Sequence, residues 1–384
     1  MSKQTKERGI AWAQGADGSP GETWNPVRGC SRVSAGCQHC YAETMAARFS
    51  GPGQPYHGLA MATPSGPRWT GEVRLVAEHL ADPLRWKRPR TIFVNSMSDL
   101  FHERLTNEQI AAVFGVMAAA PRHTFQCLTT RPKRMREWFA VRGIAEQVDG
   151  FKHIALSGRI AEYFTPERLA PAIDKEKQWA PEYTPEWPLR SVHLGVSVEN
   201  QPSADARLDD LLACPAAVRW CSYEPALAGV DFGRWLRPCP QCNGTGEFAE
   251  EHDYCAEMLG CPCMGYRPLD WIVIGGESGH NARPFDLAWA RSTIAVCKAA
   301  GVACFVKQMG AHPIIADPPR VGLPRAKWPE MEWPEGTRFG NPTGDKALNG
   351  RIVFLHDPAG GDPAEWPEDL RVRQWPNQSG RATT

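Results

Sequence analysis

Short apolar runs alternate with longer amphipathic segments between about residues 91 and 310. The runs are rich in Val, Ile, Phe and Trp, as strands are, and the segments between them repeat apolar residues at helical spacing. This alternation predicts βαβ units and therefore a parallel sheet. The predicted strands lie in 91–96, 123–131, 191–200, 217–225, 270–279 and 302–310, and predicted helices in 42–49, 107–120, 132–141, 206–215 and 286–301.

Each predicted strand ends in polar residues that could carry chemistry. In parallel α/β barrels the carboxyl ends of the strands form the active site, although polar residues also simply begin loops. The pattern favours an α/β fold built as a partial or complete parallel (β/α) barrel. The polar ends are Asn95-Ser96, Thr129-Thr130-Arg131, Ser197 with Glu199-Asn200, Ser222 with Glu224, Glu277-Ser278 and Lys307-Gln308.

The rest of the chain departs from this rhythm, and its composition predicts the domain organisation. The 384 residues are 42% hydrophobic and 22% charged, which is typical of a globular protein with a large core. We predict a flexible N-terminal arm, a barrel with two insertions, and a Pro-rich C-terminal extension. The arm covers 1–22, the barrel 23–310, the insertions about 143–190 and 236–268, and the extension 311–384.

Charge and targeting signals indicate a cytoplasmic protein with no membrane contact. The formal net charge is zero, so the chain lacks the overall basic excess of proteins that coat nucleic acid. The N-terminal residues have no apolar signal-peptide region, and the longest apolar run, 110–120, is too short to span a bilayer. In a reducing compartment, thirteen cysteines point to metal ligands more than to disulfides.

Three cysteines lie close together near the N-terminus. Cys30, Cys37 and Cys40 have the spacing C-x6-C-x2-C. A structural zinc site needs four protein ligands, and His39 or His57 could supply the fourth. A [4Fe–4S] cluster held by three cysteines would instead leave one iron open to bind S-adenosylmethionine. The spacing alone leaves both readings open.

A second cysteine group falls in the predicted insertion at 236–268. The sequence CPQCNGTG reads as a zinc knuckle, and the later CPC motif would complete a closed tetrahedral Zn²⁺ site. Cys255 or His252 could replace one ligand, and an auxiliary iron–sulfur cluster is the alternative. The predicted zinc ligands are Cys239, Cys242, Cys261 and Cys263.

Seven ordered motifs resemble a family of phage and bacterial radical S-adenosylmethionine-like proteins. They are TWNPVRGCSRVSAGCQHCYAE, NSMSDLFHE, LTTRPKRM, LGVSVENQ, SYEP, DWIVIGGESG and FVKQMG. The resemblance implies that Cys30, Cys37 and Cys40 hold a [4Fe–4S] cluster, that S-adenosylmethionine is the co-substrate, and that a reducing electron donor is a partner. The chain departs from the C-x3-C-x2-C spacing of most radical S-adenosylmethionine enzymes.

The resemblance also suggests roles for the polar strand ends. Asn95, Ser96 and Asp99 occupy the position that holds the methionine amino group. By their chemistry, Arg131, Ser197, Glu199 and Asn200 could bind the ribose and carboxylate. Glu277 could accept from an amine or hydroxyl, and Lys307 is a charge on an apolar strand that needs a partner. Glu224, Glu277 and Lys307 are the candidate catalytic residues. Alternatively, Asp99 could cap a helix and Glu224 could be an acidic residue of a turn.

Two basic runs contain tryptophan and suggest a nucleic-acid or nucleoside substrate. RWKRPR (85–90) and RPKRMREW (131–138) could bind phosphates through cations and bases through indoles. The resemblance implies, more specifically, an isomerase step in thymidine hypermodification of phage DNA, placing the protein in the host cytoplasm if phage-encoded. The alternative is a zinc-stabilised nucleic-acid-binding protein without catalysis.

Overall fold

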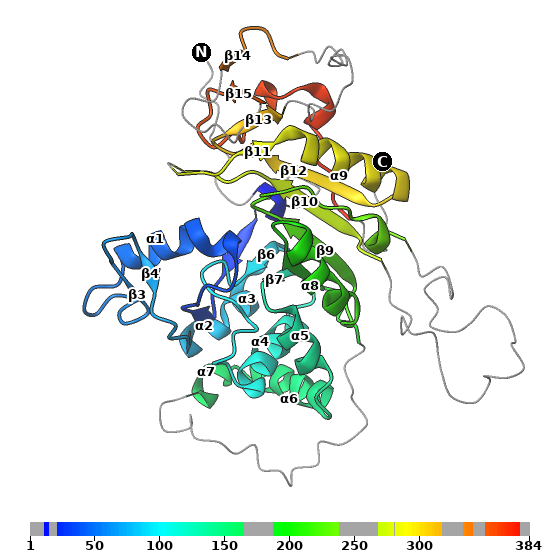
Figure 1. The fold of residues 1–384 in the computed structure, drawn as a ribbon. Helices are drawn as coiled ribbons and strands as arrows, with labels where there is room; N and C mark the ends of the chain where they lie inside the picture. Colours follow the sequence, from blue (N-terminus) through cyan, green and yellow to red (C-terminus); the bar gives the residue numbers. More distant parts are fainter. Residues whose placement is uncertain are drawn as a thin grey trace, which may run out of the picture. The chain divides into compact units, whose positions relative to one another are not determined.

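The chain folds into two compact units, which are residues 1–196 with 207–219 and residues 197–206 with 220–384. Figure 1 shows the helices and strands of this computed structural model. The structure describes residues 11–14, 21–164, 187–237, 268–279, 281–316, 333–340 and 350–376.

A parallel sheet organises the first unit. Its strand order is β1-β6-β7-β8, with every neighbour parallel. Apolar side chains of β6 are buried in succession, as expected for a strand covered on both faces. Three of these strands confirm the predicted runs, and the short β1 was not predicted. The strands are β1 (Glu22–Trp24), β6 (Thr91–Val94), β7 (Thr124–Thr129) and β8 (Val192–Ser197).

The central helix of the first unit, α4 (Asn107–Ala119), follows β6 and begins with a capping box. The amide of Gln109 donates to the Thr106 hydroxyl, and the amide of Thr106 donates to the Gln109 side chain. Gly115 lets α6 (Ile144–Leu156) approach closely, since an added Cβ would lie 2.5 Å from Phe151 Cβ. The other helices here are α2 (Ala77–Leu80), α3 (Asp82–Arg85), α5 (Pro132–Phe139) and α7 (Ile160–Tyr163).

The cysteine loop lies beside α1 in a part of the first unit built from very short strands. These strands form two separate antiparallel pairs, β2 with β5 and β3 with β4. Figure 1 shows β3 and β4 beside α1. Their bounds are β2 (Val27–Arg28), β3 (Ala60–Met61), β4 (Arg68–Trp69) and β5 (Arg74–Leu75), next to η2 (Ala35–His39) and α1 (Tyr41–Arg48).

The predicted flexible arm is anchored at one point. Within η1 (Ala11–Ala13), Trp12 is buried, and its ring centroid lies 4.8 Å from that of Phe93 on β6. Aromatic packing of this kind is favourable, so Trp12 contributes to the core beside β6. The predicted insertion at about 143–190 likewise begins with the ordered helix α6.

The second unit contains parallel strands that pair in the order β9-β10-β12. The helix α9 precedes β12; the Asp286 carboxylate accepts from Ala288 N at its start, and Gly301 ends it at a φ of 68°. A second sheet has the order β11-β13-β15-β14. The elements are α8 (Gln201–Leu212), β9 (Val218–Tyr223), η4 (Gly233–Trp235), β10 (Trp271–Gly275), β11 (Phe285–Asp286), α9 (Leu287–Ala300), β12 (Ala303–Gln308), β13 (Pro313–Ala316), β14 (Arg338–Gly340), β15 (Gly350–Phe354), η5 (Pro363–Glu365) and η6 (Glu368–Leu370).

The predicted α/β class with parallel strands is therefore confirmed. Each predicted strand between 91 and 310 coincides with an observed parallel strand, and the predicted helices coincide with α1, α4, α5, α8 and α9. Within the described residues, none of the helices combines the length and apolarity that crossing a bilayer requires.

Candidate functional site

Successive tight turns hold the three cysteines at the start of α1. The amide of Cys37 donates to Ser34 O at 3.1 Å, and the amide of Cys40 donates to Cys37 O at 3.3 Å. Cys40 is the N-cap residue of α1, and the side chains of all three cysteines are half-buried. The loop therefore presents three thiols from one short segment, partly shielded from water.

Burial opposes ionisation of Cys30 and Cys40. It raises the pKa of Cys30 to about 12; the Asp99 carboxylate and the other two cysteines also raise it, while Arg131 lowers it. Burial likewise raises the pKa of Cys40, although the amides of Ala42 and Glu43 partly offset this by favouring the thiolate. A bound cation would offset this effect of burial on Cys30 and Cys40 by favouring their thiolate forms.

A buried carboxylate, Asp99, links the ends of β6 and β7. Its Oδ1 accepts from the Thr129 hydroxyl at 2.7 Å, and its Oδ2 accepts from the amide and hydroxyl of Thr130 at 3.0 and 3.1 Å. The same oxygen accepts from Arg131 Nη1 at 3.0 Å, and both side chains of this ion pair are buried. Asp99 also accepts from Phe101 N, so it caps a local turn as well.

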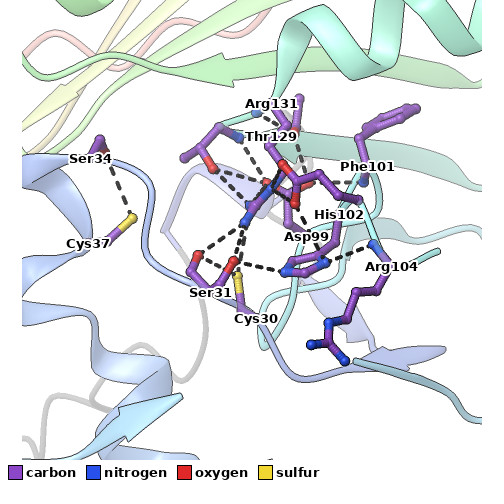
Figure 2. Close-up of polar contacts among 12 residues, drawn as sticks. Cys30, Ser31, Ser34, Cys37, Asp99, Phe101, His102, Arg104, Thr129 and Arg131 are labelled. Carbon is purple, nitrogen blue, oxygen red and sulfur yellow. Dashed lines mark hydrogen bonds and ion pairs between the residues drawn. The ribbon is translucent and has the colours of Figure 1, made fainter. Parts of the chain in front are cut away.

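Arg131 joins this carboxylate to the cysteine loop (Figure 2). Its Nη2 donates to the carbonyl and hydroxyl of Ser31 at 3.1 and 2.8 Å, and its Nη1 lies 4.0 Å from the sulfur of Cys30. Its Nε donates to both oxygens of Glu103 at 2.9 Å. The positive charge beside Cys30 would stabilise a thiolate there.

His102 completes the network in its neutral form. Its Nδ1 accepts from the amide of Arg104 at 3.2 Å, so the ring proton lies on Nε2, which is 2.9 Å from the Ser31 hydroxyl. Burial and the charge of Arg131 lower the pKa of His102, in agreement with this assignment. Ser31, His102 and Glu103 were not among the predicted site residues; only their proximity in the fold identifies them.

Asn95, at the carboxyl end of β6, has two unusual properties. Its φ is 60°, in the left-handed region that side chains rarely adopt, and the residue is buried. Among the described residues, neither its amide oxygen nor its amide nitrogen has a hydrogen-bond partner. Buried polar groups are normally paired, and strained backbone is often retained at functional sites. This amide is therefore a candidate ligand-binding group.

Its neighbour Ser96 is fully engaged within the protein. The Ser96 hydroxyl lies 3.1 and 3.2 Å from the side-chain amide atoms of Asn25, and its carbonyl accepts from the Tyr41 hydroxyl at 2.7 Å. Asn25 Oδ1 also accepts from Met97 N. These bonds tie α1 to the end of β6, and Asn25 was not predicted from the sequence.

The polar strand ends of the second unit are arranged differently. Lys307 Nζ lies 2.9 Å from Glu224 Oε1, and the Ser222 hydroxyl donates to Glu224 Oε2 at 3.2 Å. Glu277 accepts from Arg283 N, Nε and Nη2 at 2.9, 2.9 and 2.7 Å. The partner that the charge of Lys307 required is thus Glu224.

The predicted strand-end residues Ser197, Glu199 and Asn200 lie just before the start of α8. The Ser203 hydroxyl accepts from the amides of Glu199 and Asn200 at 2.8 and 3.0 Å, and Asn200 Oδ1 accepts from Ser203 N. Asn200 therefore caps α8. Glu199 is buried, whereas Ser197, the last residue of β8, is half-buried.

The two basic runs are largely committed to the protein itself. Arg131 is buried in the network described above, Arg136 pairs with Asp210 at 3.0 Å, and Trp138 is a core residue. In the other run, Arg85 pairs with Asp82, Arg90 pairs with Glu22, and Lys87 and Arg88 are exposed. These runs give less support for nucleic-acid binding than their sequences suggested.

A single-ion site is not formed at the cysteine loop. Across the part of the chain that the structure describes, no three His, Cys, Asp or Glu side chains are arranged to hold one metal ion. In a cubane each cysteine binds a different iron, so the sulfurs need not converge on one point. The predicted ligands Cys239, Cys242, Cys261 and Cys263 lie outside the described residues.

A family model described as "Protein of unknown function (DUF5131)" matches residues 9–353. The chain belongs to this family. The match spans the cysteine loop, the parallel strands of both units and the polar strand ends. Comparison with curated proteins and with solved structures gives no match.

Proposed function

We propose that this chain is a radical S-adenosylmethionine enzyme. Cys30, Cys37 and Cys40 would hold a [4Fe–4S] cluster within a partial (β/α) barrel. When bound, the cluster supplies the electron that cleaves the sulfonium of S-adenosylmethionine to give a carbon radical. The observation that carries the proposal is the network from Cys30 through Ser31 and Arg131 to Asp99.

The chemistry of the donor set supports this fit. Cys30, one of three half-buried thiols, lies 4.0 Å from Arg131, and the amides at the start of α1 partly offset the effect of burial on Cys40. A cluster bound by three thiolates carries negative charge, which a nearby guanidinium and helix amides would stabilise. Asn95 offers an unpaired buried amide at the adjacent strand end, suited to the polar amino-acid part of S-adenosylmethionine.

Glu224, Glu277 and Lys307 of the second unit remain the proposed acid–base residues. Lys307 and Glu224 form an ion pair with Lys307 partly exposed, so either could exchange a proton with a bound group. The finer proposal is hydrogen abstraction from a nucleic-acid or nucleoside-linked substrate, as in an isomerase step of thymidine hypermodification. This rests on the family resemblance of the motifs.

Anaerobic reconstitution with iron and sulfide tests the proposal. We expect a brown protein with about four irons per chain that cleaves S-adenosylmethionine to 5′-deoxyadenosine when reduced. Cys37→Ala should lose both properties. Cys214→Ala, which removes a buried thiol elsewhere in the first unit, is the control and should keep both. A colourless wild-type protein that retains only zinc would instead support the non-catalytic alternative.

A further inference from the structure

Two arginines face each other across the β2–β5 pair. Arg28 and Arg74 are direct partners in this antiparallel ladder, so their side chains project from the same side. Directly opposite residues have Cβ atoms about 4.5–5.5 Å apart, and like charges there repel. No described carboxylate pairs with either one: Arg28 lies over the Tyr56 ring at 5.6 Å, and Arg74 Nη2 donates to His57 O at 3.4 Å.

The surrounding segment is basic in a chain of zero net charge. Residues 25–75 contain five arginines and two glutamates, with no lysine or aspartate. Both glutamates are already engaged, since Glu43 pairs with Arg32 and Glu72 pairs with Arg104. The positive charge of Arg28 and Arg74 is therefore not neutralised by the acids of its own segment.

Aromatic side chains accompany this pair. The Tyr56 ring, which Arg28 covers, lies 6.4 Å from that of Trp69, and Tyr56 N donates to Phe49 O. Phe49 is 45% exposed, which is unusual for so large an apolar side chain, and it follows the exposed Arg48. Cations interleaved with accessible aromatic rings suit a flexible strand whose phosphates and bases alternate.

We propose that Arg28 and Arg74 form a phosphate-binding pair for a single-stranded nucleic acid, with the rings around Tyr56 and Phe49 stacking on its bases. Guanidinium groups bind phosphate oxygens through paired N–H donors, and two adjacent ones match a phosphodiester's charge and shape. This rests on the proposed function and deepens it by choosing a polymer over a free nucleoside.

The position of Arg28 connects this site to the cysteine loop. Only Gly29 separates it from Cys30, and Gly29 has a φ of 93° with its backbone against Glu72 O. An added Cβ would lie 2.1 Å from that oxygen, so the glycine keeps the chain tight against β5. A strand held by Arg28 would therefore lie beside the first cysteine.

Binding of a fluorescent single-stranded DNA oligonucleotide, measured by anisotropy over a series of salt concentrations, tests the site. We compare R28Q/R74Q with K87Q/R88Q, which removes the same charge from the exposed part of a sequence-predicted basic run. The first variant should lose about tenfold or more in affinity, and its salt dependence should become shallower by about 1.4 log units per log unit of salt. The second should bind like wild type.

One further variant, a stability measurement and a competing ligand make the result decisive. R28K/R74K keeps the charge but not the paired donors, so it should bind with intermediate affinity and retain the wild-type salt dependence. Thermal unfolding should show R28Q/R74Q to be no less stable than wild type, because a like-charge pair is removed. Inorganic phosphate should compete only weakly with the oligonucleotide.

Three results would overturn the site: no oligonucleotide binding by wild type, equal binding by R28Q/R74Q, or a loss confined to K87Q/R88Q. Tight binding of inorganic phosphate without oligonucleotide binding would also overturn it. Iron and sulfide content tests the proposed function and needs no nucleic acid, whereas oligonucleotide affinity needs no cluster. Failure of the proposed function and failure of the nucleic-acid site can therefore be told apart.

Discussion

The two units each collect charged side chains at the ends of parallel strands, but they arrange them in opposite ways. In the first unit, Asp99 and Arg131 form one buried network that extends to Cys30. In the second, Glu277 is matched by Arg283 and Glu224 by Lys307, and both basic partners are partly exposed. The first is a connected cluster, and the second consists of separate ion pairs.

This difference shows that polar strand ends are a weak guide to function by themselves. Ion pairs can stabilise a strand end without any ligand, and a partly exposed pair contributes little. A buried network that reaches three thiols, next to an unpaired amide at Asn95, is harder to explain as scaffold. The predictions below test whether the two clusters differ in energy as well as in connectivity.

Asp99→Ala should give the largest loss of stability. Removal of this carboxylate takes away the buried counter-ion of Arg131 and leaves the hydroxyl protons of Thr129 and Thr130 without their acceptor. Breaking a buried ion pair costs about 3–5 kcal/mol, which urea unfolding of the metal-free chain would measure. Glu103→Ala is the matched control; its side chain is 60% exposed, so about 1 kcal/mol or less is expected.

Equal losses of stability in Asp99→Ala and Glu103→Ala would mean that Arg131 is held mainly by its solvent-exposed partner, Glu103. The first cluster would then resemble the second, and the argument for a connected site would lose its basis. A large loss in Asp99→Ala alone would support the buried network as the feature that positions Cys30.

Glu277→Ala should have a smaller effect in the second unit. It removes three hydrogen bonds from Arg283, but that side chain is 24% exposed and can be hydrated again. Hydrogen bonds to charged groups contribute about 1.5–3 kcal/mol, and we expect a value in this range from urea unfolding. Lys307→Met, with a side chain 28% exposed, should cost still less. A loss above that of Asp99→Ala would reverse the comparison.

The sequence predicted the regular elements well where the pattern was long. The strand β10 is buried at every position and α4 carries a complete capping box, so both are visible in the local sequence. The strand β1 has three residues, too few to show a period, and was missed. The Pro/Trp-rich segment at 143–190 hid the start of α6 because its helical part is short relative to the irregular part.

The site was predicted only in part, for a physical reason. The cysteines and Asp99 are recognisable because their residue types are unusual in their setting. Ser31 and Glu103 are ordinary residues that matter only because Arg131 reaches them from about 100 and about 30 positions away in the chain, respectively. The run at 131–138 misled for the same reason, since Trp138 faces the core rather than a ligand.

Alkaline pH should destabilise the metal-free chain. Burial raises the pKa of Cys30 and of Cys214 to about 12, whereas an unfolded thiol ionises near 9. Between these values the unfolded chain binds fewer protons than the folded one, so stability falls as pH rises. For each such thiol the loss is about 1.4 kcal/mol per pH unit above 9. Urea midpoints measured from pH 8 to pH 10 would show it.

Iron loading separates the two thiols. A metal-bound thiolate has already lost its proton. The contribution of Cys30 to the alkaline loss of stability should therefore disappear in the loaded protein, while that of Cys214 remains. Cys214→Ala should remove the remaining share. An alkaline slope that iron loading leaves unchanged would argue against Cys30 as a ligand and would weaken the contrast between the clusters.

Asn95→Gly should change stability least and binding most selectively. Glycine accepts a φ of 60° without strain, and the variant removes two unpaired buried atoms, so the unfolding free energy should stay within about 1 kcal/mol of wild type. If the amide binds S-adenosylmethionine, loss of one or two hydrogen bonds should weaken co-substrate affinity about tenfold. Asn25→Ala is the matched control, because that amide is already bonded to Ser96 and Met97. Asn25→Ala should lower the melting temperature while changing the affinity for S-adenosylmethionine little. If calorimetry instead showed that Asn95→Gly lowers stability and leaves this affinity unchanged, Asn95 would be a structural residue.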